Sequence, residues 1–245
     1  MSSQELSQGG RQNGRTNTGS LERKLEQELM VDPAHVRAYA QADFEAAHQA
    51  VVDWITERYG ELAPGTSVLD IGCGPGDVTR RLLKAQPAID VIAVDGSRPM
   101  LDLAQRLTQE AGLAARVNYV QALIHELPSK MQFIQVDLAI CTSVLHHLSD
   151  PQILWSTLSE MRQGTRPLEV VVTDLIRPET ESIAIATVER LAEKERPELK
   201  QDFFNSLCAA FTLDEVRTQL ARAGQEALRV EAMDELHLIV SGEVS

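Results

Sequence analysis

Residues 68–77 of the chain read VLDIGCGPGD, an apolar run followed by three glycines within five positions. The apolar run predicts a buried strand, and the glycines predict a tight loop that opens a helix. Glycine tolerates positive φ and lets a ligand approach the backbone closely. We therefore expect a strand, a loop at a ligand site and a helix, with Asp77 as the N-cap of that helix.

The strand and helix signals continue in alternation on the C-terminal side of this loop. Short β-branched runs occur at 91–95, 117–121, 136–140 and 168–174, and amphipathic helical patterns occur at 78–85, 98–112 and 151–161. Apolar strands that alternate with helices are typical of a parallel sheet covered on both faces. The runs at 227–233 and 235–242 predict an antiparallel hairpin. The expected fold is α/β, a doubly wound, Rossmann-like, mostly parallel seven-stranded sheet with an antiparallel C-terminal hairpin and a helical cap.

Three regions divide the chain in this interpretation. Residues 1–20 are polar and predict a disordered tail, and residues 21–60 predict two N-terminal helices that include Tyr39. Residues 61–245 form the main domain, in which a stretch at about 177–210, interrupted by Pro178 and Pro197, is expected to be a helical cap. Thr212 and Glu215 predict a capping box at the start of the next helix.

Composition limits the classes of partner. The formal net charge is −13, which disfavours nucleic acid because phosphate contacts need a cationic surface. No apolar run is long enough for a membrane span, and the first residues lack the core of a secretory signal. The three cysteines, Cys73, Cys141 and Cys208, match neither a disulfide framework nor a zinc spacing, so no metal site is expected. We expect a soluble cytoplasmic protein of unknown oligomeric state.

A carboxylate follows the glycine loop at an informative distance. Asp95 ends the next strand, 19 residues after Gly76, where an acidic side chain would accept hydrogen bonds from ribose hydroxyls. A dinucleotide fold is the competing interpretation, but its motif would require glycine at position 77, which is Asp77 here. The acidic groups Asp70 and Asp77 favour a cationic ligand over a pyrophosphate.

The segment 68–77 resembles motif I of class I S-adenosylmethionine-dependent methyltransferases, and VIAVDGSRPML at 91–101 is similar to their motif II. The resemblance covers about residues 62–178. It implies S-adenosylmethionine as cofactor, with Asp70 near its amino group and Asp95 on its ribose. The cofactor-binding residues that it implies are Asp70, Gly72, Cys73, Gly74, Gly76, Asp95, Gly96, Met100, Ala122, Leu123, Ile124, Thr142 and Ser143.

Two of these groups have specific expected places. Met100 would form an apolar wall for the adenine. Leu123 stands where relatives often carry an acid for the adenine amine, so the backbone of residues 122–124 is expected to make that contact instead. Thr142 and Ser143, at the exit of the fourth strand, would line the methionine end of the cofactor.

The candidate catalytic residues are His146, Asp174 and Tyr39. Methyl transfer needs in-line approach and exclusion of water, and it needs a base only where the acceptor must lose a proton. His146, from a Leu-His-His-Leu turn, would face the methyl group or the acceptor; the alternative is a packed or capping histidine. Arg177 is a candidate for pairing with a carboxylate substrate.

Three functional hypotheses follow. The preferred one is a methyltransferase that acts on a small-molecule acceptor. The second is an RNA or protein methyltransferase. The third is a non-catalytic cofactor-binding protein or a nucleotide-dependent oxidoreductase. The three phenylalanines Phe203, Phe204 and Phe211 suit either an apolar acceptor pocket or simple packing of the cap.

Overall fold

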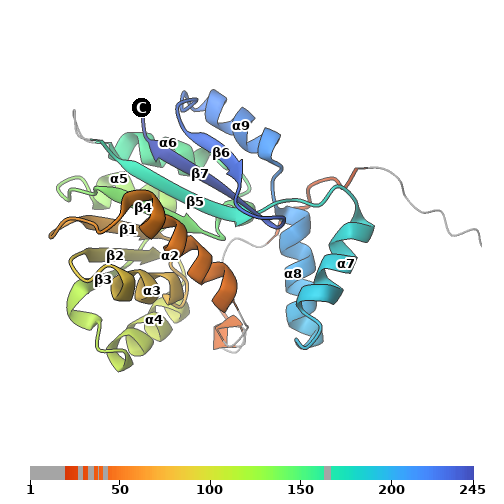
Figure 1. Cartoon of the computed structure of the whole chain (residues 1–245), viewed down its shortest axis with the longest axis horizontal. Helices are drawn as coiled ribbons and strands as arrows, with labels where there is room; N and C mark the ends of the chain where they lie inside the picture. Colours follow the sequence, from red (N-terminus) through yellow and green to blue (C-terminus); the bar gives the residue numbers. More distant parts are fainter. Residues whose placement is uncertain (1–19, 27–29, 33–35, 38, 41–43, 163–166) are drawn as a thin grey trace, which may run out of the picture.

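A seven-stranded sheet forms the centre of the molecule (Figure 1). The computed structural model describes residues 20–26, 30–32, 36, 37, 39, 40, 44–162 and 167–245. The sheet has the order β3-β2-β1-β4-β5-β7-β6, in which β1 to β5 are parallel and β7 is antiparallel to β5 and β6. The strands are β1 (Ser67–Ile71), β2 (Asp90–Asp95), β3 (Val117–Gln121), β4 (Leu138–Thr142), β5 (Glu169–Leu175), β6 (Arg229–Ala232) and β7 (His237–Glu243).

Helices connect these strands and cover the sheet. They are α2 (Glu45–Tyr59), α3 (Asp77–Ala85), α4 (Arg98–Glu110), α5 (Leu127–Lys130), α6 (Gln152–Met161), α7 (Glu181–Leu191), α8 (Pro197–Ala209) and α9 (Leu213–Arg222). Three short 3₁₀ helices lie at η1 (Ala114–Arg116), η2 (Ile124–Glu126) and η3 (Leu145–His147). The mostly parallel seven-stranded sheet and the antiparallel C-terminal hairpin are confirmed.

The central strands are buried on both faces, as their apolar sequences predict. Val68 of β1 lies in one hydrophobic cluster, whereas Leu69 and Ile71 lie in another. The same alternation separates Ile140 of β4 from Cys141. Since successive side chains of a strand point to opposite faces, each face of the sheet has its own core.

The helix starts agree with the sequence in part. Thr212 and Glu215 form the expected capping box, in which the Glu215 backbone N–H donates to Thr212 Oγ1 over 3.2 Å and the Thr212 N–H donates to Glu215 Oε2 over 2.9 Å. The expectation for Asp77 was wrong, because Gly76 is the N-cap and Asp77 is the first helical residue. Its carboxylate instead accepts from Arg81 Nε over 2.7 Å and contacts His48.

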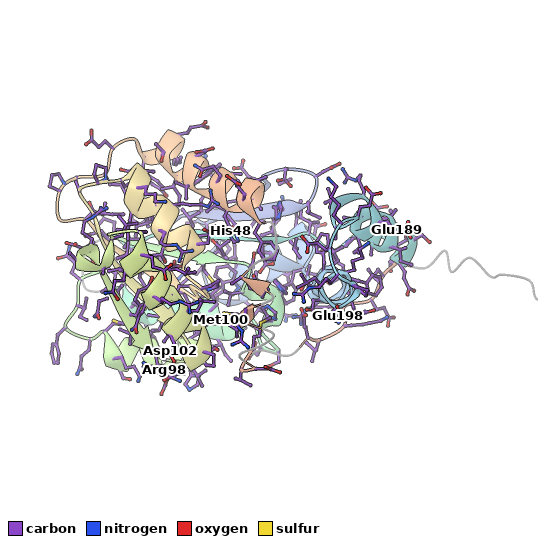
Figure 2. All side chains as sticks on the ribbon, turned by 90° about the horizontal axis from the view of Figure 1, so that it is seen from below. His48, Arg98, Met100, Asp102, Glu189 and Glu198 are labelled. Atoms are coloured by element: carbon purple, nitrogen blue, oxygen red, sulfur yellow. The ribbon has the colours of Figure 1, made fainter. Side chains whose placement is uncertain are left out.

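Helices α7 and α8 pack against each other at one end of the molecule, away from most of the sheet (Figure 1). In Figure 2, Glu189 of α7 and Glu198 of α8 lie to the right, away from Arg98 and Asp102 of α4. Burial of Leu207 and its neighbours gives these helices a cluster of their own. The assignment of this region as a cap inserted at about 177–210 stays a prediction.

The N-terminal part agrees only in part with the two expected helices, since α2 (Glu45–Tyr59) is a helix and the start of the segment is not. Residues 20–26 form no helix, and Leu21 is buried in the α7–α8 cluster. Its backbone N–H donates to the Glu179 carbonyl over 2.8 Å, and the Lys24 N–H donates to the Cys208 carbonyl over 3.0 Å. This segment therefore lies beside the N-terminal end of α7 and the C-terminal end of α8. The expected disordered tail at 1–20 lies outside the described residues except for Ser20.

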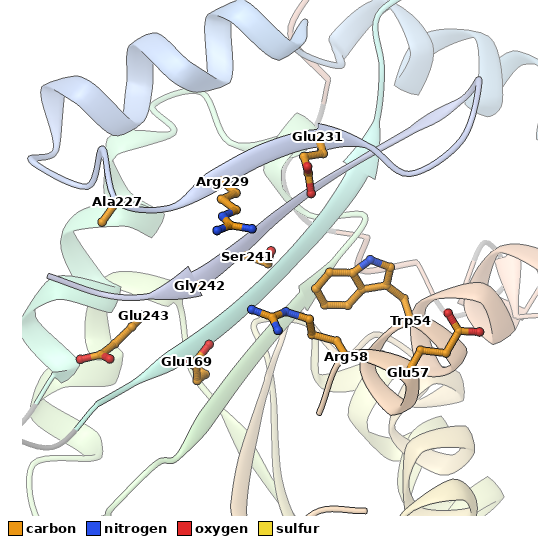
Figure 3. A pocket seen from close by; sticks show the side chains of 10 residues that line it. All are labelled: Trp54, Glu57, Arg58, Glu169, Ala227, Arg229, Glu231, Ser241, Gly242 and Glu243. Atoms are coloured by element: carbon orange, nitrogen blue, oxygen red, sulfur yellow. The ribbon is translucent and has the colours of Figure 1, made fainter. Parts of the chain in front are cut away.

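A cavity of about 610 Å³ lies near the amino end of β5 (Figure 3). Trp54 and Arg58 of α2 face it from one side, and Arg229 and Ser241 face it from the β6–β7 hairpin. Ligands of open parallel sheets bind at the carboxyl ends of the strands, which is the opposite end of β5. No helix in the described part of the chain combines the length and apolarity needed to cross a bilayer.

Replacement of Leu154 by Ala tests the core under α6. Leu154 is fully buried, so the cavity left by the change should lower the free energy of unfolding by about 2 to 5 kcal/mol. Leu191→Ala is the matched control, because Leu191 is 49% exposed on α7 and its loss should cost under about 1 kcal/mol. Urea unfolding measures both, and equal losses would contradict this core.

Candidate functional site

The glycine loop after β1 folds back against β2. The backbone N–H groups of Gly72 and Cys73 both donate to the Val94 carbonyl, over 2.8 and 2.9 Å. Gly72 has φ of +72°, and a Cβ built there would lie 2.3 Å from Val144 Cγ2. Gly74 has φ of +51°, and no atom lies within 4 Å of its Cβ position. Gly72 therefore permits close packing on the turn after β4, whereas Gly74 borders open space.

Asp95 at the end of β2 is tied directly to this loop. Its Oδ2 accepts from the Gly74 backbone N–H over 2.9 Å, and its Oδ1 accepts from the Ser97 N–H over 2.7 Å. Burial raises the pKa of the Asp95 carboxyl, although these two hydrogen bonds oppose the rise. The structure thus brings together the loop and the acid that the sequence paired by spacing.

The exit of β3 lies beside the same acid. The Ala122 backbone N–H donates to the Asp95 carbonyl over 3.2 Å, and Gln121 Nε2 donates to the Gly96 carbonyl over 3.1 Å. Met100 is buried on the first turn of α4. Leu123 is 40% exposed and immediately precedes η2, which begins at Ile124. The residues expected to surround the adenine therefore border the Asp95 end of the loop.

Asp70 and Cys73 are buried beneath the loop. Asp70 Oδ2 accepts a hydrogen bond from the Thr79 hydroxyl of α3. Burial raises the pKa of Asp70 to about 7, which the Thr79 hydrogen bond opposes and the nearby charge of Asp95 increases. Burial likewise raises the pKa of the Cys73 thiol. A cation bound near the loop would favour the ionised form of Asp70.

The exit of β4 contains a backbone conformation that non-glycine residues rarely adopt. Ser143 has φ of +56° and is the one non-glycine residue with positive φ in the described ranges. Its backbone N–H donates to the Thr173 carbonyl of β5 over 2.9 Å, and the Thr173 hydroxyl lies 3.3 Å from that of Thr142. Such conformations persist only when the surroundings impose them, and they concentrate at functional sites.

His146 and Asp174 form a buried pair at the carboxyl ends of β4 and β5. Nδ1 of His146 lies 2.6 Å from Asp174 Oδ1, and the His146 backbone N–H donates to Asp174 Oδ2 over 3.0 Å. Burial lowers the pKa of His146, but the charge and hydrogen bond of Asp174 outweigh it and leave the pKa raised. Burial raises the pKa of Asp174, and His146 more than offsets this, so Asp174 is held ionised.

Tyr39 lies close enough to Asp174 and Asp95 for their charges to affect the pKa of its phenol. Its ring packs on Phe44 with centroids 4.9 Å apart. Burial raises the pKa of Tyr39 to about 12, and the negative charges of Asp174, Asp95 and Glu26 add to the rise. The phenol therefore lies within electrostatic reach of both the glycine-loop acid and the His146–Asp174 pair. It stays protonated at neutral pH and can donate a hydrogen bond.

Sequence reasoning missed two residues of the N-terminal segment. Arg23 Nη2 donates to the carbonyls of His146 and Leu148, both over 2.9 Å. Glu26 Oε2 lies 3.8 Å from His146 Nε2 and 3.7 Å from His147 Nδ1. Nothing in the local sequence indicates these contacts, because they join positions more than 100 residues apart.

Arg177 and Phe211 both make contacts within the protein. Arg177 Nη2 donates to Glu215 Oε1 over 2.6 Å, and its Nη1 donates to the Ala210 carbonyl over 3.0 Å. Glu215 thus already pairs with the guanidinium, and the pairing of Arg177 with a substrate carboxylate stays a prediction. Phe211 is buried in the main core with the Arg23 guanidinium 3.9 Å from its ring centroid.

Comparison with known proteins identifies the part of the chain that holds the loop. Residues 68–168 match a family model described as a methyltransferase domain. The chain contains a class I S-adenosylmethionine-dependent methyltransferase domain. The matched range includes β1 to β4 and all the candidate cofactor residues from Asp70 to Ser143.

Relatives of this methyltransferase domain come from several bacteria. A ubiquinone biosynthesis O-methyltransferase of Acinetobacter baylyi is 31% identical over 136 residues, which are 51% of this chain and 55% of that protein. A protein of the same name from Bordetella avium is 34% identical over 100 residues, which are 41% of this chain and 39% of that protein. The chain spans about half the length, or less, of the curated relatives it matches.

Solved structures share the fold of the methyltransferase domain. A SAM-dependent methyltransferase from Aquifex aeolicus superposes with a TM-score of 0.61 at 19% identity, covering 88% of this chain and 100% of that one. The plantazolicin methyltransferase BpumL, solved with S-adenosylhomocysteine (SAH), gives 0.64 at 14% identity, covering 87% and 89%. At such identities the likeness establishes the fold.

Gly72→Ala tests the close approach between the loop and the β4 exit. The new methyl group would collide with Val144 and adopt an unfavourable backbone, so we expect a loss of unfolding free energy of about 2 kcal/mol or more. The double variant with Val144→Ala should recover part of this loss, because the colliding Cγ atom is gone. Urea unfolding of the four proteins measures the coupling, and strictly additive losses would argue against this contact.

Asp70→Asn tests the raised pKa of Asp70. In the folded protein Asp70 holds a proton between pH 4 and about 7 that the unfolded chain releases, so its contribution to stability falls as pH rises through this range. The variant should therefore gain stability relative to the parent by about 2 kcal/mol between pH 5.5 and 8.5. Asp102→Asn on the exposed face of α4 is the control, and a gain independent of pH would contradict the assignment.

Proposed function

We propose that this protein transfers the methyl group of S-adenosylmethionine to a small-molecule acceptor by in-line displacement. The observation that carries the proposal is the hydrogen bond from the Gly74 N–H to Asp95 at the carboxyl edge of the sheet. It holds an open glycine loop beside the acid that we propose binds the nucleoside. The matched methyltransferase domain includes both residues.

The cofactor residues are proposed from their positions around the loop. Gly72, Cys73, Gly74 and Gly76 would hold the methionine part through their backbone, with Asp70 beneath its ammonium group. Asp95 and Gly96 would bind the ribose, and the adenine would lie between Met100 and the backbone of residues 122–124. Thr142 and Ser143 would close the methionine end.

The acceptor side is proposed at His146, Asp174 and Tyr39. Asp174 positions the His146 ring through the 2.6 Å contact, and Tyr39 offers a phenolic donor whose pKa of about 12 keeps its proton in place. The bound cofactor supplies an electrophilic methyl group on a sulfonium that leaves as a neutral thioether. The task of these residues is then to orient the nucleophile in line and to exclude water.

Charge supports a small acceptor over a nucleic acid. The acceptor side gathers the carboxylates of Glu26 and Asp174, and the whole chain has a net charge of −13. Phosphates would be repelled from such a surface. The O-methyltransferase relatives named above favour an oxygen nucleophile. The free cysteines support a reducing compartment such as the cytoplasm.

The competing functions differ from this proposal in what they bind. An RNA methyltransferase would show salt-sensitive binding of RNA, and a protein methyltransferase would label a polypeptide. A non-catalytic cofactor-binding protein would bind S-adenosylmethionine but would transfer its methyl group to no acceptor. An oxidoreductase would bind NAD.

Asp95→Ala tests the cofactor site. Parallel calorimetric titrations with S-adenosylmethionine, SAH and NAD should show saturable binding of the first two alone. Loss of the ribose hydrogen bonds to a charged group should weaken SAH binding about 10-fold to 100-fold in the variant. Asp102→Ala is the control, since Asp102 is exposed on α4 and pairs with Arg98 at 2.8 Å.

Two results would count against the proposal. NAD binding in place of SAH would overturn the cofactor assignment. Equal SAH affinity in Asp95→Ala and the parent would remove Asp95 from the site. Transfer of a radioactive methyl group to hydroxylated aromatic compounds, set against transfer to RNA and to peptides, then tests the class of acceptor.

A further inference from the structure

Three side chains that can bind a metal ion, those of Glu26, His146 and His147, lie close together beside Asp174. Glu26 comes from the N-terminal segment, and His146 and His147 come from η3. One ligand atom from each lies within 4.8 Å of the others. Glu26 Oε2 is 3.8 Å from His146 Nε2 and 3.7 Å from His147 Nδ1.

These separations are within ion-pair distance but too long for hydrogen bonds, and a shared ion could lie between the atoms. Charge-assisted hydrogen bonds between imidazolium and carboxylate span about 2.7 to 2.9 Å. Two nitrogen or oxygen ligands that each lie about 2.1 Å from one zinc ion are about 3.4 Å apart at the tetrahedral angle, and separations of 3.7 and 3.8 Å correspond to angles opened to about 125° to 130°. Glu26 Oε2 therefore lies at distances from His146 Nε2 and from His147 Nδ1 that one shared ion can span, and the three side chains offer ligand atoms within 4.8 Å of one another.

Two of the three ligands are already oriented by a further hydrogen bond. Nδ1 of His146 faces the ionised Asp174 at 2.6 Å, so this nitrogen carries the proton and Nε2 is left toward Glu26. The Ser206 hydroxyl of α8 donates to Glu26 Oε2 over 3.0 Å. A carboxylate behind the far nitrogen of a histidine is the usual support of a metal-binding imidazole.

The surrounding charge also suits a cation. The carboxylates of Glu26, Asp174 and Asp202 act on this region, and Arg23 and a protonated His146 are positive groups in it. Burial raises the pKa of Glu26, which the charge of His146 opposes. When His146 is neutral, as metal binding requires, the three carboxylates outnumber the Arg23 guanidinium, so a divalent ion would relieve their repulsion.

We propose that Glu26, His146 and His147 bind a divalent transition metal ion of the zinc type. Two imidazoles and one carboxylate are a ligand set that zinc uses, and imidazole disfavours magnesium and calcium. Three protein ligands leave a tetrahedral ion one further position, which water or an acceptor oxygen fills. The sequence alone predicts no metal here, because position 26 is far from positions 146 and 147.

A metal at this place would also serve the proposed methyl transfer. A hydroxyl bound to such an ion loses its proton more readily than a free one, which prepares an oxygen nucleophile without a protein base. This consequence rests on the proposed function. Metal binding itself does not, and it is measured without any cofactor or acceptor.

The test uses the full chain, free of any histidine tag and treated with a chelator. Titration with Zn²⁺ should show one bound equivalent, and Co²⁺ should give the visible absorption of a low-coordinate nitrogen and oxygen site. Glu26→Gln, whose amide oxygen can still accept from Ser206, should weaken Zn²⁺ binding more than about 100-fold, and so should His147→Asn. Mg²⁺ should not compete.

His237→Asn is the matched control, because it removes a histidine that contacts Asp234 at 2.9 Å on the β6–β7 hairpin. It should bind Zn²⁺ as the parent does. Far-ultraviolet circular dichroism and urea unfolding show that each variant is folded. Absence of a bound equivalent in the parent, or equal Zn²⁺ affinity in Glu26→Gln and His237→Asn, would overturn the proposal, whether or not methyl transfer is detected.

Discussion

The proposed acceptor side of the molecule depends on one buried carboxylate, that of Asp174. It accepts hydrogen bonds from the His146 backbone over 3.0 Å and from the Leu175 N–H over 2.6 Å, and it contacts His146 Nδ1 at 2.6 Å. A carboxylate removed from water is unstable unless such donors surround it. The turn after β4 is therefore held against the end of β5, and the orientation of the His146 ring follows from the same contacts. Neutralising Asp174 would release both together.

Only part of the proposed site lies within the residues that match the methyltransferase family model. The glycine loop, Asp95 and the β4 exit all lie within the matched residues 68–168. Asp174, Tyr39 and Glu26 lie outside that range. The half that would bind the cofactor is thus built from a shared domain, whereas the half that would bind the acceptor adds groups from β5 and the N-terminal segment. This division explains why the resemblance specifies a cofactor and leaves the acceptor open.

The sequence predicts those features that depend on local patterns. Asp95 and the glycine loop were paired by spacing, and the alternation of β-branched runs and helices predicted a mostly parallel sheet. Residues 21–26 were misjudged, because a Glu-rich and Leu-rich segment favours a helix by propensity, yet here the backbone N–H groups of Leu21 and Lys24 donate to the carbonyls of Glu179 and Cys208. Glu26 was missed for the same reason, since only tertiary structure brings it to His146.

The N-terminal segment couples the acceptor side to helices α7 and α8. Leu21 packs in the cluster of these helices, and Ser206 of α8 holds the Glu26 carboxylate. Arg23 connects the same segment to the His146 and Ala209 carbonyls. A shift of α8 would therefore act on Glu26 through Ser206 and on the turn of His146 through Arg23, while Gly72 of the glycine loop packs on Val144 just before that turn. The position of α7 and α8 is thus linked to the polar groups at the acceptor side and only indirectly to the cofactor loop.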